Sequence, residues 1–292
     1  MTTTGAIYDR GYRPYEGIRL GRNGARRGLF LASVRRALGF RRSWRQKVTP
    51  WVLLAISTTP AIVFIGIGYV TRNTDADFEI VTYQDYVGIS TVLLLFVAHT
   101  APDVMCPDRR HRMLSIIFAR PLTGIDYALT KVASIFAITF AFALIPQLIL
   151  YVGQIAVDKS PLDYALDNAS VLWKSPLAVL VLTYFLSVLG VACASLTKNR
   201  IVGGALFIGF MLFTSAIAGI VLAASGGEGT GALLNFIGLP LYLRDIIFEG
   251  QINTGSPLSG VPGGGVLALI TYLIVTSSAL GVVLARYRKV DV

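Results

Sequence analysis

Six long runs of mostly apolar, almost uncharged residues divide the chain and limit the folds open to it. They cover residues 51–70, 86–104, 132–151, 176–196, 201–224 and 266–285. Each has 19 to 24 residues, a length that crosses a hydrocarbon core of ~30 Å as an α-helix. We therefore predict an all-α integral membrane protein with six transmembrane helices.

The composition supports the membrane class. Hydrophobic residues make up 54% of the chain and charged residues only 14%, whereas soluble proteins have ~25% charged residues. A net charge of +10 is compatible with nucleic-acid binding, but the basic residues are concentrated in particular loops. We therefore expect the basic loops to contact membrane lipids and no nucleic acid.

The distribution of basic residues predicts the orientation. Alternate segments, namely the N-terminus, the second and fourth connections and the C-terminus, together hold 22 of the 26 Lys and Arg residues. Because basic residues accumulate on the cytoplasmic side of membrane proteins, we predict that both termini are cytoplasmic.

The first 49 residues divide into two parts. We expect residues 1–27 to form a basic cytoplasmic extension and residues 28–49 an interfacial amphipathic helix, followed by the six-span domain over 50–292. Phe30, Val34 and Leu38 recur at helical spacing, with Arg35 and Arg36 opposite. Arg41 and Arg45 return to the apolar side, where the helix is expected to end.

The segment over residues 106–131 separates the second and third spans and is predicted to be cytoplasmic. It contains a short amphipathic helix ended by Pro121. Its apolar face contains Leu114, Ile117, Phe118 and Leu122, and we expect that face to dock in a groove of a partner protein.

The segment over residues 226–263 is the longest predicted external connection. Its middle, residues 233–248, is too apolar for a solvated loop but is interrupted by Gly238, Pro240, Arg244 and Asp245. It is too broken to span the membrane, so we expect a pair of broken re-entrant or interfacial helices.

The spans lack the groups that an autonomous transporter needs. Asp103, at the inner end of the second span, is the nearest Asp, Glu, Lys or Arg to a span interior, and no GxxxxGK[ST] phosphate loop occurs. The two His and two Cys residues are not at metal-ligand spacing, and no catalytic nucleophile has a base at a recognisable spacing. We expect neither an enzyme nor a bound metal or cofactor, and any energy must come from a partner.

A few polar residues lie within the spans and are candidates for lining a substrate pathway, namely His99, Gln147, Thr214 and Ser215. His99 and Asp103, four residues apart, form either a proton or substrate contact or a helix-end pair that solvates itself. Gly203, Gly204, Gly209 and Gly219 give the fifth span small-residue faces suited to helix packing or dimer contacts.

The 106–131 segment also carries a family resemblance. The charged Pro107-Asp108-Arg109-Arg110, the apolar helix, the Arg120-Pro121-Leu122 turn, Asp126-Tyr127 and Lys131 resemble the permease subunits of type-2 ABC exporters. The six-span layout extends this resemblance over most of the chain from about residue 28. The family often has Glu where this chain has Asp108.

The resemblance implies a multi-pass permease in the bacterial cytoplasmic membrane, with a second permease copy in a homodimer and two separate ATP-binding cassette subunits that bind ATP and Mg. It assigns ATPase coupling to the 106–131 segment, with these residues: Asp108, Arg109, Arg110, Leu114, Ile117, Phe118, Arg120 and Pro121. The expected substrate is amphipathic or lipid-like. The alternatives are a non-transporting assembly or sensor subunit that uses the same ATPase interface, and a secondary transporter, which the missing carboxylates disfavour.

Overall fold

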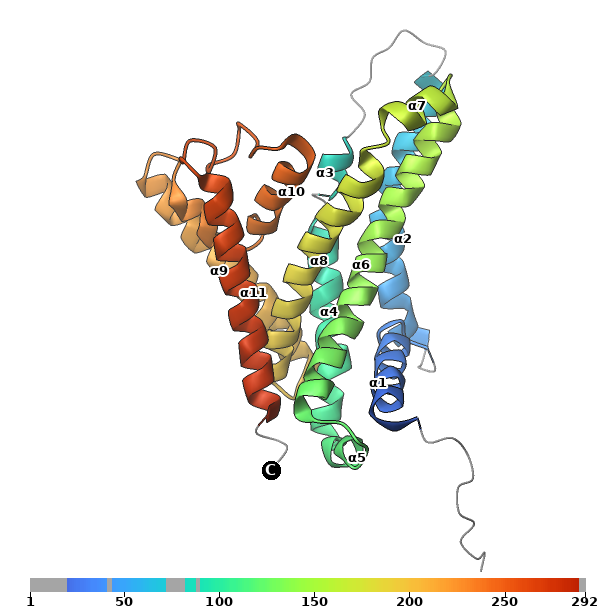
Figure 1. Cartoon of the computed structure of the whole chain (residues 1–292), viewed down its shortest axis with the longest axis vertical. Coiled ribbons are helices and arrows are strands. Elements are labelled where there is room, and N and C mark those ends of the chain that lie inside the picture. Colours follow the sequence, from blue (N-terminus) through green and yellow to red (C-terminus); the bar gives the residue numbers. More distant parts are fainter. Residues whose placement is uncertain (1–19, 41–43, 72–81, 88–89, 289–292) are drawn as a thin grey trace, which may run out of the picture.

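The structure, a computed structural model, describes residues 20–40, 44–71, 82–87 and 90–288, and every regular element in them is a helix (Figure 1). Six candidate spans are long and apolar enough to cross a membrane, which confirms the predicted all-α, six-span class. Their main helices are α2 (Trp44–Thr71), α4 (Ser90–Arg110), α6 (Gly124–Val157), α8 (Val171–Leu196), α9 (Arg200–Ala224) and α11 (Gly264–Arg288). The short helix α3 (Tyr83–Val87) precedes α4.

The helices on either side of the 106–131 segment are longer than predicted. Helix α4 continues to Arg110, six residues beyond the predicted end, and α6 begins at Gly124, eight residues before the predicted start. Both extensions contain charged residues, which the apolar runs exclude by definition. Only residues 111–123 therefore lie outside these two helices.

Helices α4 and α8 form the centre of the bundle. Of their most apolar stretches, 75% and 78% of the residues are buried, against 11% for α2 and 17% for α9. In Figure 1, α6 and α2 lie on one side of this centre, and α9 and α11 on the other. A displacement of α4 would therefore be felt by most of the bundle, whereas α2 and α9 expose wide apolar surfaces.

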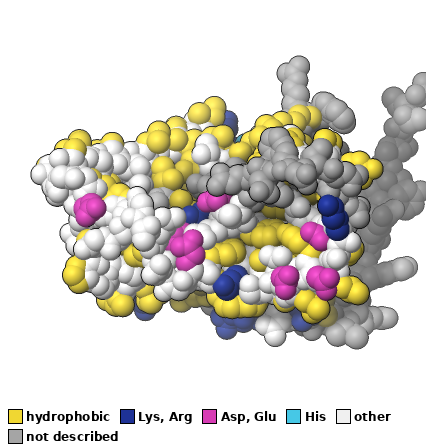
Figure 2. All heavy atoms as spheres, turned by 90° about the horizontal axis from the view of Figure 1, so that it is seen from above, with side chains coloured by type: hydrophobic (Ala, Val, Ile, Leu, Met, Phe, Trp, Pro, Cys, Tyr) yellow, Lys and Arg dark blue, Asp and Glu magenta, His cyan; other side chains and the backbone are white. Residues whose placement is uncertain are grey.

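The two ends of the bundle differ in their side chains. Helices α1 (Gly21–Ala37) and α5 (Leu114–Phe118) lie at the same end as the last turn of α11, which we call the α5 end (Figure 1). Helix α7 (Pro161–Asp167) lies at the opposite end, the α7 end. Figure 2 looks onto the α7 end, where acidic side chains are scattered over a largely apolar and uncharged surface.

Helix α1 corrects the predicted bounds of the amphipathic helix. It begins seven residues before position 28 and ends at Ala37, and residues 44–49 already belong to α2. Ala37 is buried, and Val34 and Leu38 pack against the core, so the predicted apolar face is turned toward the bundle. Residues 1–19 of the predicted basic extension, and Arg41, lie outside the described residues.

The 226–263 segment contains one α-helix rather than a helix pair. A single 3₁₀ turn, η1 (Thr230–Leu234), is followed by α10 (Leu239–Glu249), which packs on α8 and α11. Asn235 fixes the turn that precedes this helix, because its Oδ1 accepts from the backbone N–H groups of Ile237 and Gly238. Gly250 ends it in the left-handed conformation, with φ of 77°.

Candidate functional site at the α5 end

The chain leaves α4 through a left-handed turn. Met113 N–H donates to the Asp108 carbonyl (2.9 Å) and Arg112 N–H to the Arg109 carbonyl (3.3 Å). This pair of bonds is the Schellman arrangement that satisfies the last carbonyls of a helix. It requires φ of 53° at Arg112, a conformation that glycine adopts far more readily. The turn aims α5 across the end of the bundle.

A buried charge cluster joins this turn to the rest of the protein. Asp108 and Lys131 are 3% and 2% exposed, and the Lys131 ammonium lies 2.7 Å from Asp108 Oδ2. Arg36 of α1 donates to Asp108 Oδ1 (2.8 Å), and the Tyr127 hydroxyl donates to Oδ2 (2.9 Å). Lys131 also donates to the Val104 carbonyl (3.2 Å). One carboxylate thus holds α1, α4 and α6 together.

A second acidic residue, Asp126, joins the start of α6 to α1. Asp126 and Thr123 form a capping box, in which each side chain accepts from the other residue's backbone N–H. The same carboxylate accepts from Arg22 Nε (2.6 Å) and Arg26 Nε (2.9 Å). The bond to Asp126 raises the pKa of Arg22. Both ends of residues 111–123 are therefore fixed to α1.

These contacts correct the predicted role of the arginines in α1. The sequence predicts Arg36 opposite the apolar face of the helix, but in the structure it pairs with Asp108. Arg22, Arg26 and Arg36 fall within about a quarter of the helix circumference, since 14 residues make nearly four turns. Arg35 alone keeps the exposed position predicted for the pair.

The end of α4 is also tied to the turn between α8 and α9. Arg109 donates to the carbonyl oxygens of Ser195 and Thr197 at the end of α8. Arg200, at the start of α9, donates to Asp103 Oδ1 (2.6 Å). The site therefore connects to four of the six long helices: α4, α6, α8 and α9.

The predicted docking face of α5 is turned inward, which corrects our expectation for it. Leu114, Ile117 and Phe118 pack against the protein's own core, and Leu122 is buried. The Phe118 ring meets the Tyr127 ring edge-on, with 5.9 Å between centroids. Leu114, Ile117 and Phe118 are half-buried, and their contacts with the core fix α5 to the bundle.

The exposed side of α5 has a different composition. Ile116, 66% exposed, is its most exposed apolar side chain, and Met113, three residues earlier, is 40% exposed. The remaining exposed residues around it are mostly basic or small: Arg110, His111, Arg112, Ser115, Ala119, Arg120 and Pro121. An apolar centre with a basic surround suits a partner groove that has acidic edges.

A cavity of about 240 Å³ lies between α5, α1 and the start of α6. Its lining includes Arg36, Asp108 and Lys131 of the charge cluster, and Ile116 and Arg120 from the α5 segment. Ser33 also lines it, and its buried hydroxyl has no hydrogen-bond partner among the described residues. The cavity leaves α5 room to move toward α1 without compressing packed side chains.

The four candidate pathway residues lie on three different helices. His99 is on the exposed side of α4, whereas Gln147 of α6 is 3% exposed and accepts from Ser175 of α8. On α9, Thr214 donates to its own helix and Ser215 donates to Asn235. The contacts of Gln147 and Ser215 serve helix packing and the start of α10.

The glycines of α9 divide into two groups. A Cβ on Gly203 would lie 3.0 Å from Pro102, and one on Gly204 would lie 2.7 Å from the Ala98 carbonyl. These two glycines allow α9 to approach α4. Gly209 and Gly219 face open space, so they remain free for contact with another molecule.

Sequence reasoning missed the attachment of α1 to residues 108–131. A basic helix with arginines at positions 22, 26 and 36 looks like a lipid-facing surface, and Asp108 and Asp126 lie about 70 to 100 residues away. The one signal in the sequence at this site was the Thr123-x-x-Asp126 spacing, which is typical of a capping box and indicates the start of α6. Among the described residues, no three His, Cys, Asp or Glu side chains are grouped to hold a metal ion.

Comparison with known proteins finds no family model that matches the chain and no significantly similar curated protein. The resemblance to exporter permeases therefore depends on the residues quoted above. The proposed function therefore depends on the geometry of the α5 end.

Proposed function

We propose that the chain is the permease subunit of an ATP-driven ABC exporter that moves an amphipathic or lipid-like substrate across the bacterial cytoplasmic membrane. The observation that carries the proposal is the attachment of α5. This short helix is exposed on one side and packs against the core on the other, and the Asp108–Lys131 pair next to it joins the central helix α4 to α6. A push on α5 would therefore reach the centre of the bundle.

In this proposal the α5 end is cytoplasmic and both termini are on that side. The support is electrostatic, because 22 of the 26 Lys and Arg residues belong to the segments predicted there. Helix α1 then lies at the membrane interface, and the 226–263 segment is a re-entrant element on the outside. Two ATP-binding subunits, which bind ATP and Mg, would contact the exposed side of α5.

The same proposal includes a second copy of the chain. Helices α2 and α9 are the least buried of the long helices, and Gly209 and Gly219 leave α9 with open small-residue positions. His99 lies on the exposed side of α4. A second copy that packed against α2, α9 and the exposed side of α4 would cover His99. It would place this side chain beside a route between the two chains.

The decisive test is the exposed side of α5. We expect Ile116→Asp and Arg120→Glu to abolish co-purification of an ATPase that carries a phosphate loop, and with it the substrate-stimulated ATP hydrolysis in lipid nanodiscs. Leu162→Asp, at a leucine of α7 that is 79% exposed at the opposite end, is the control and should leave both unchanged.

Retained ATPase binding in both α5 variants would contradict the proposed interface. ATP hydrolysis by the complex without transport of any amphipathic probe in vesicles would favour the non-transporting assembly or sensor subunit instead.

A further inference from the structure

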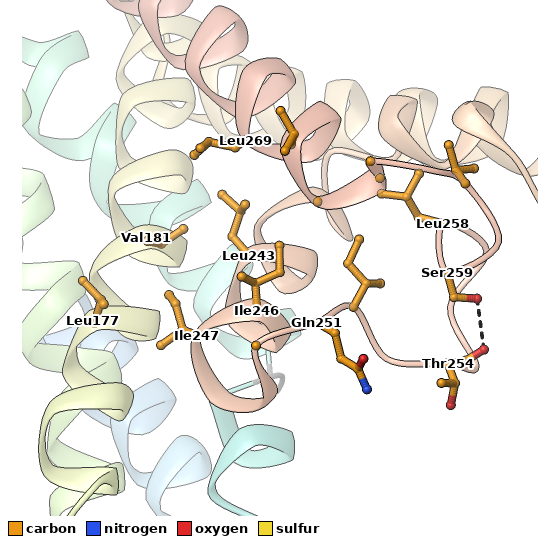
Figure 3. Close-up of a pocket in the computed structure, with 17 residues that line it drawn as sticks. Leu177, Val181, Leu243, Ile246, Ile247, Gln251, Thr254, Leu258, Ser259 and Leu269 are labelled. Carbon is orange, nitrogen blue, oxygen red and sulfur yellow. Dashed lines mark hydrogen bonds between the residues drawn. The ribbon is translucent and has the colours of Figure 1, made fainter.

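A large cavity lies near the α7 end, far along the chain from α5. Its volume is about 720 Å³, and it is bounded by α8, α10, α11 and the segment that joins α10 to α11 (Figure 3). Apolar side chains from the three helices point into it: Leu177, Val181, Leu243, Ile246, Ile247 and Leu269. Pockets for small organic ligands measure ~300–1,000 Å³, so the size suits a bound molecule.

The other side of the cavity is polar but uncharged. Gln251, Thr254 and Ser259 of the joining segment line it, and no charged residue in the described part of the chain does (Figure 3). The Ser259 hydroxyl donates to the carbonyl oxygens of Thr254 (3.0 Å) and Ser256 (2.7 Å), which fixes this turn. The cavity is therefore amphipathic, with hydrogen-bonding groups on one side only.

The cavity opens between two helices that are candidate membrane spans. Leu177 of α8 and Val266 and Leu269 of α11 line it and are 40%, 63% and 46% exposed. In a membrane, hydrocarbon would meet these side chains, and water does not fill an apolar cavity. A lipid chain is thus the component of the surroundings that suits the apolar walls.

The charges nearby argue against an anionic head group. Glu249 directly precedes the joining segment, and a Cβ on Gly260 would lie 2.6 Å from the Glu228 carboxylate. The two cations of this region are engaged, since Lys174 donates to the Phe248 carbonyl (2.7 Å) and Arg244 pairs with Asp245 (2.6 Å). A phosphate at the rim would meet these acidic neighbours, and among the described residues no charged side chain lines the cavity to offset them.

We infer that this cavity binds one acyl chain of a membrane lipid whose uncharged, hydroxyl-bearing head group bonds to Gln251 and the Thr254–Ser259 turn. The inference needs only that the chain spans a membrane, and it does not depend on the exporter function.

Photolabelling tests the site directly. The full chain, in phosphatidylcholine nanodiscs with a trace of diacylglycerol that carries a diazirine on one acyl chain, is irradiated and the labelled residues are mapped by mass spectrometry. We expect labels on α10 and on residues 250–269. Leu269→Trp enlarges a side chain that points into the cavity, so that it obstructs the position of the acyl chain. It should reduce this labelling by ~tenfold or more, which corresponds to a loss of ~1.4 kcal/mol or more of binding free energy.

Leu273→Trp is the matched control, one turn along α11 and similarly exposed but outside the cavity lining, and should label like the parent. If Leu269→Trp does not fold, Gln251→Leu at the exposed rim provides an independent variant, with weaker labelling by the diacylglycerol probe and an unchanged melting temperature.

Three results would overturn the inference: labels spread evenly along the exposed face of α11, labelling that Leu269→Trp and Gln251→Leu both leave unchanged, or equal labelling by a diazirine phosphatidylglycerol. The last result would mean that the rim does not select uncharged heads.

Discussion

Two buried carboxylates, Asp108 near α5 and Asp245 in α10, are held in opposite ways. Asp108 is 3% exposed and receives Lys131, Arg36 and Tyr127 from two other helices, with Arg36 at 72 residues' separation. Asp245 is 4% exposed, and its ion partner is the adjacent Arg244, while Gln84 of α3 adds one amide N–H at 3.1 Å.

The difference shows what each region is built to resist. The Asp108 cluster joins α1, α4 and α6, so no one of these helices can move without uncovering a buried charge. The Asp245 charge is neutralised by its neighbour within α10, so this ion pair does not depend on the position of another helix. Long-range charge pairing thus accompanies the proposed transmission of force, and local pairing accompanies the proposed lipid site.

The difference between the two carboxylates is tested most directly by neutralising each of them in turn. Asp108→Asn leaves the buried Lys131 and the half-buried Arg36 without a carboxylate, and should reduce the free energy of unfolding by ~3–5 kcal/mol. Asp245→Asn should cost only ~1.5 kcal/mol, because Arg244 still donates to the Gln84 carbonyl at 2.9 Å. Denaturant titration in mixed micelles measures both, and equal losses would show that the origin of the partners does not matter.

Removing one long-range partner sharpens the same comparison with a smaller effect. Arg36→Met should cost ~1–1.5 kcal/mol, at the low end for a charged hydrogen bond, because the Arg36 side chain is 24% exposed. It should also increase amide hydrogen exchange throughout α1. Arg35→Met is the control on the neighbouring exposed residue and should change neither quantity. Fast exchange of α1 in the parent protein would contradict the proposed attachment.

The sequence was sufficient to predict the six long helices, because uncharged length alone decides whether a segment can cross a membrane. The sequence predicted the end of α4 too early and the start of α6 too late, because charged residues occur inside both helices. Asp108 and Lys131 belong to α4 and α6 because each neutralises the other, and this pairing is formed only in the folded bundle. A search for uncharged runs does not recognise two charges that neutralise each other in the folded protein.

The site was harder to predict for two physical reasons. A five-residue helix is too short for periodicity to decide which side is buried, and α5 has apolar residues on both sides, Ile116 outward and Ile117 inward. The second reason is that pairing between α1 and residues 108–126 spans about 70 to 100 positions. A single sequence shows which residues are charged but not which of them form pairs.

The smallest expected effect concerns the turn that sets the direction of α5. Arg112 has φ of 53°, a conformation that costs an L-residue ~1–2 kcal/mol, so Arg112→Gly should raise the free energy of unfolding by ~0.5–1 kcal/mol after the greater freedom of glycine in the unfolded chain is deducted. Arg110→Gly, two residues earlier in the last turn of α4, should instead lower it by ~0.5 kcal/mol. Opposite signs in these two variants would establish that the turn, and not the loss of basic charge, governs the result. A loss of stability in both would mean that the turn relaxes in the membrane, and that α5 is held by its buried side chains and the Asp108 cluster alone.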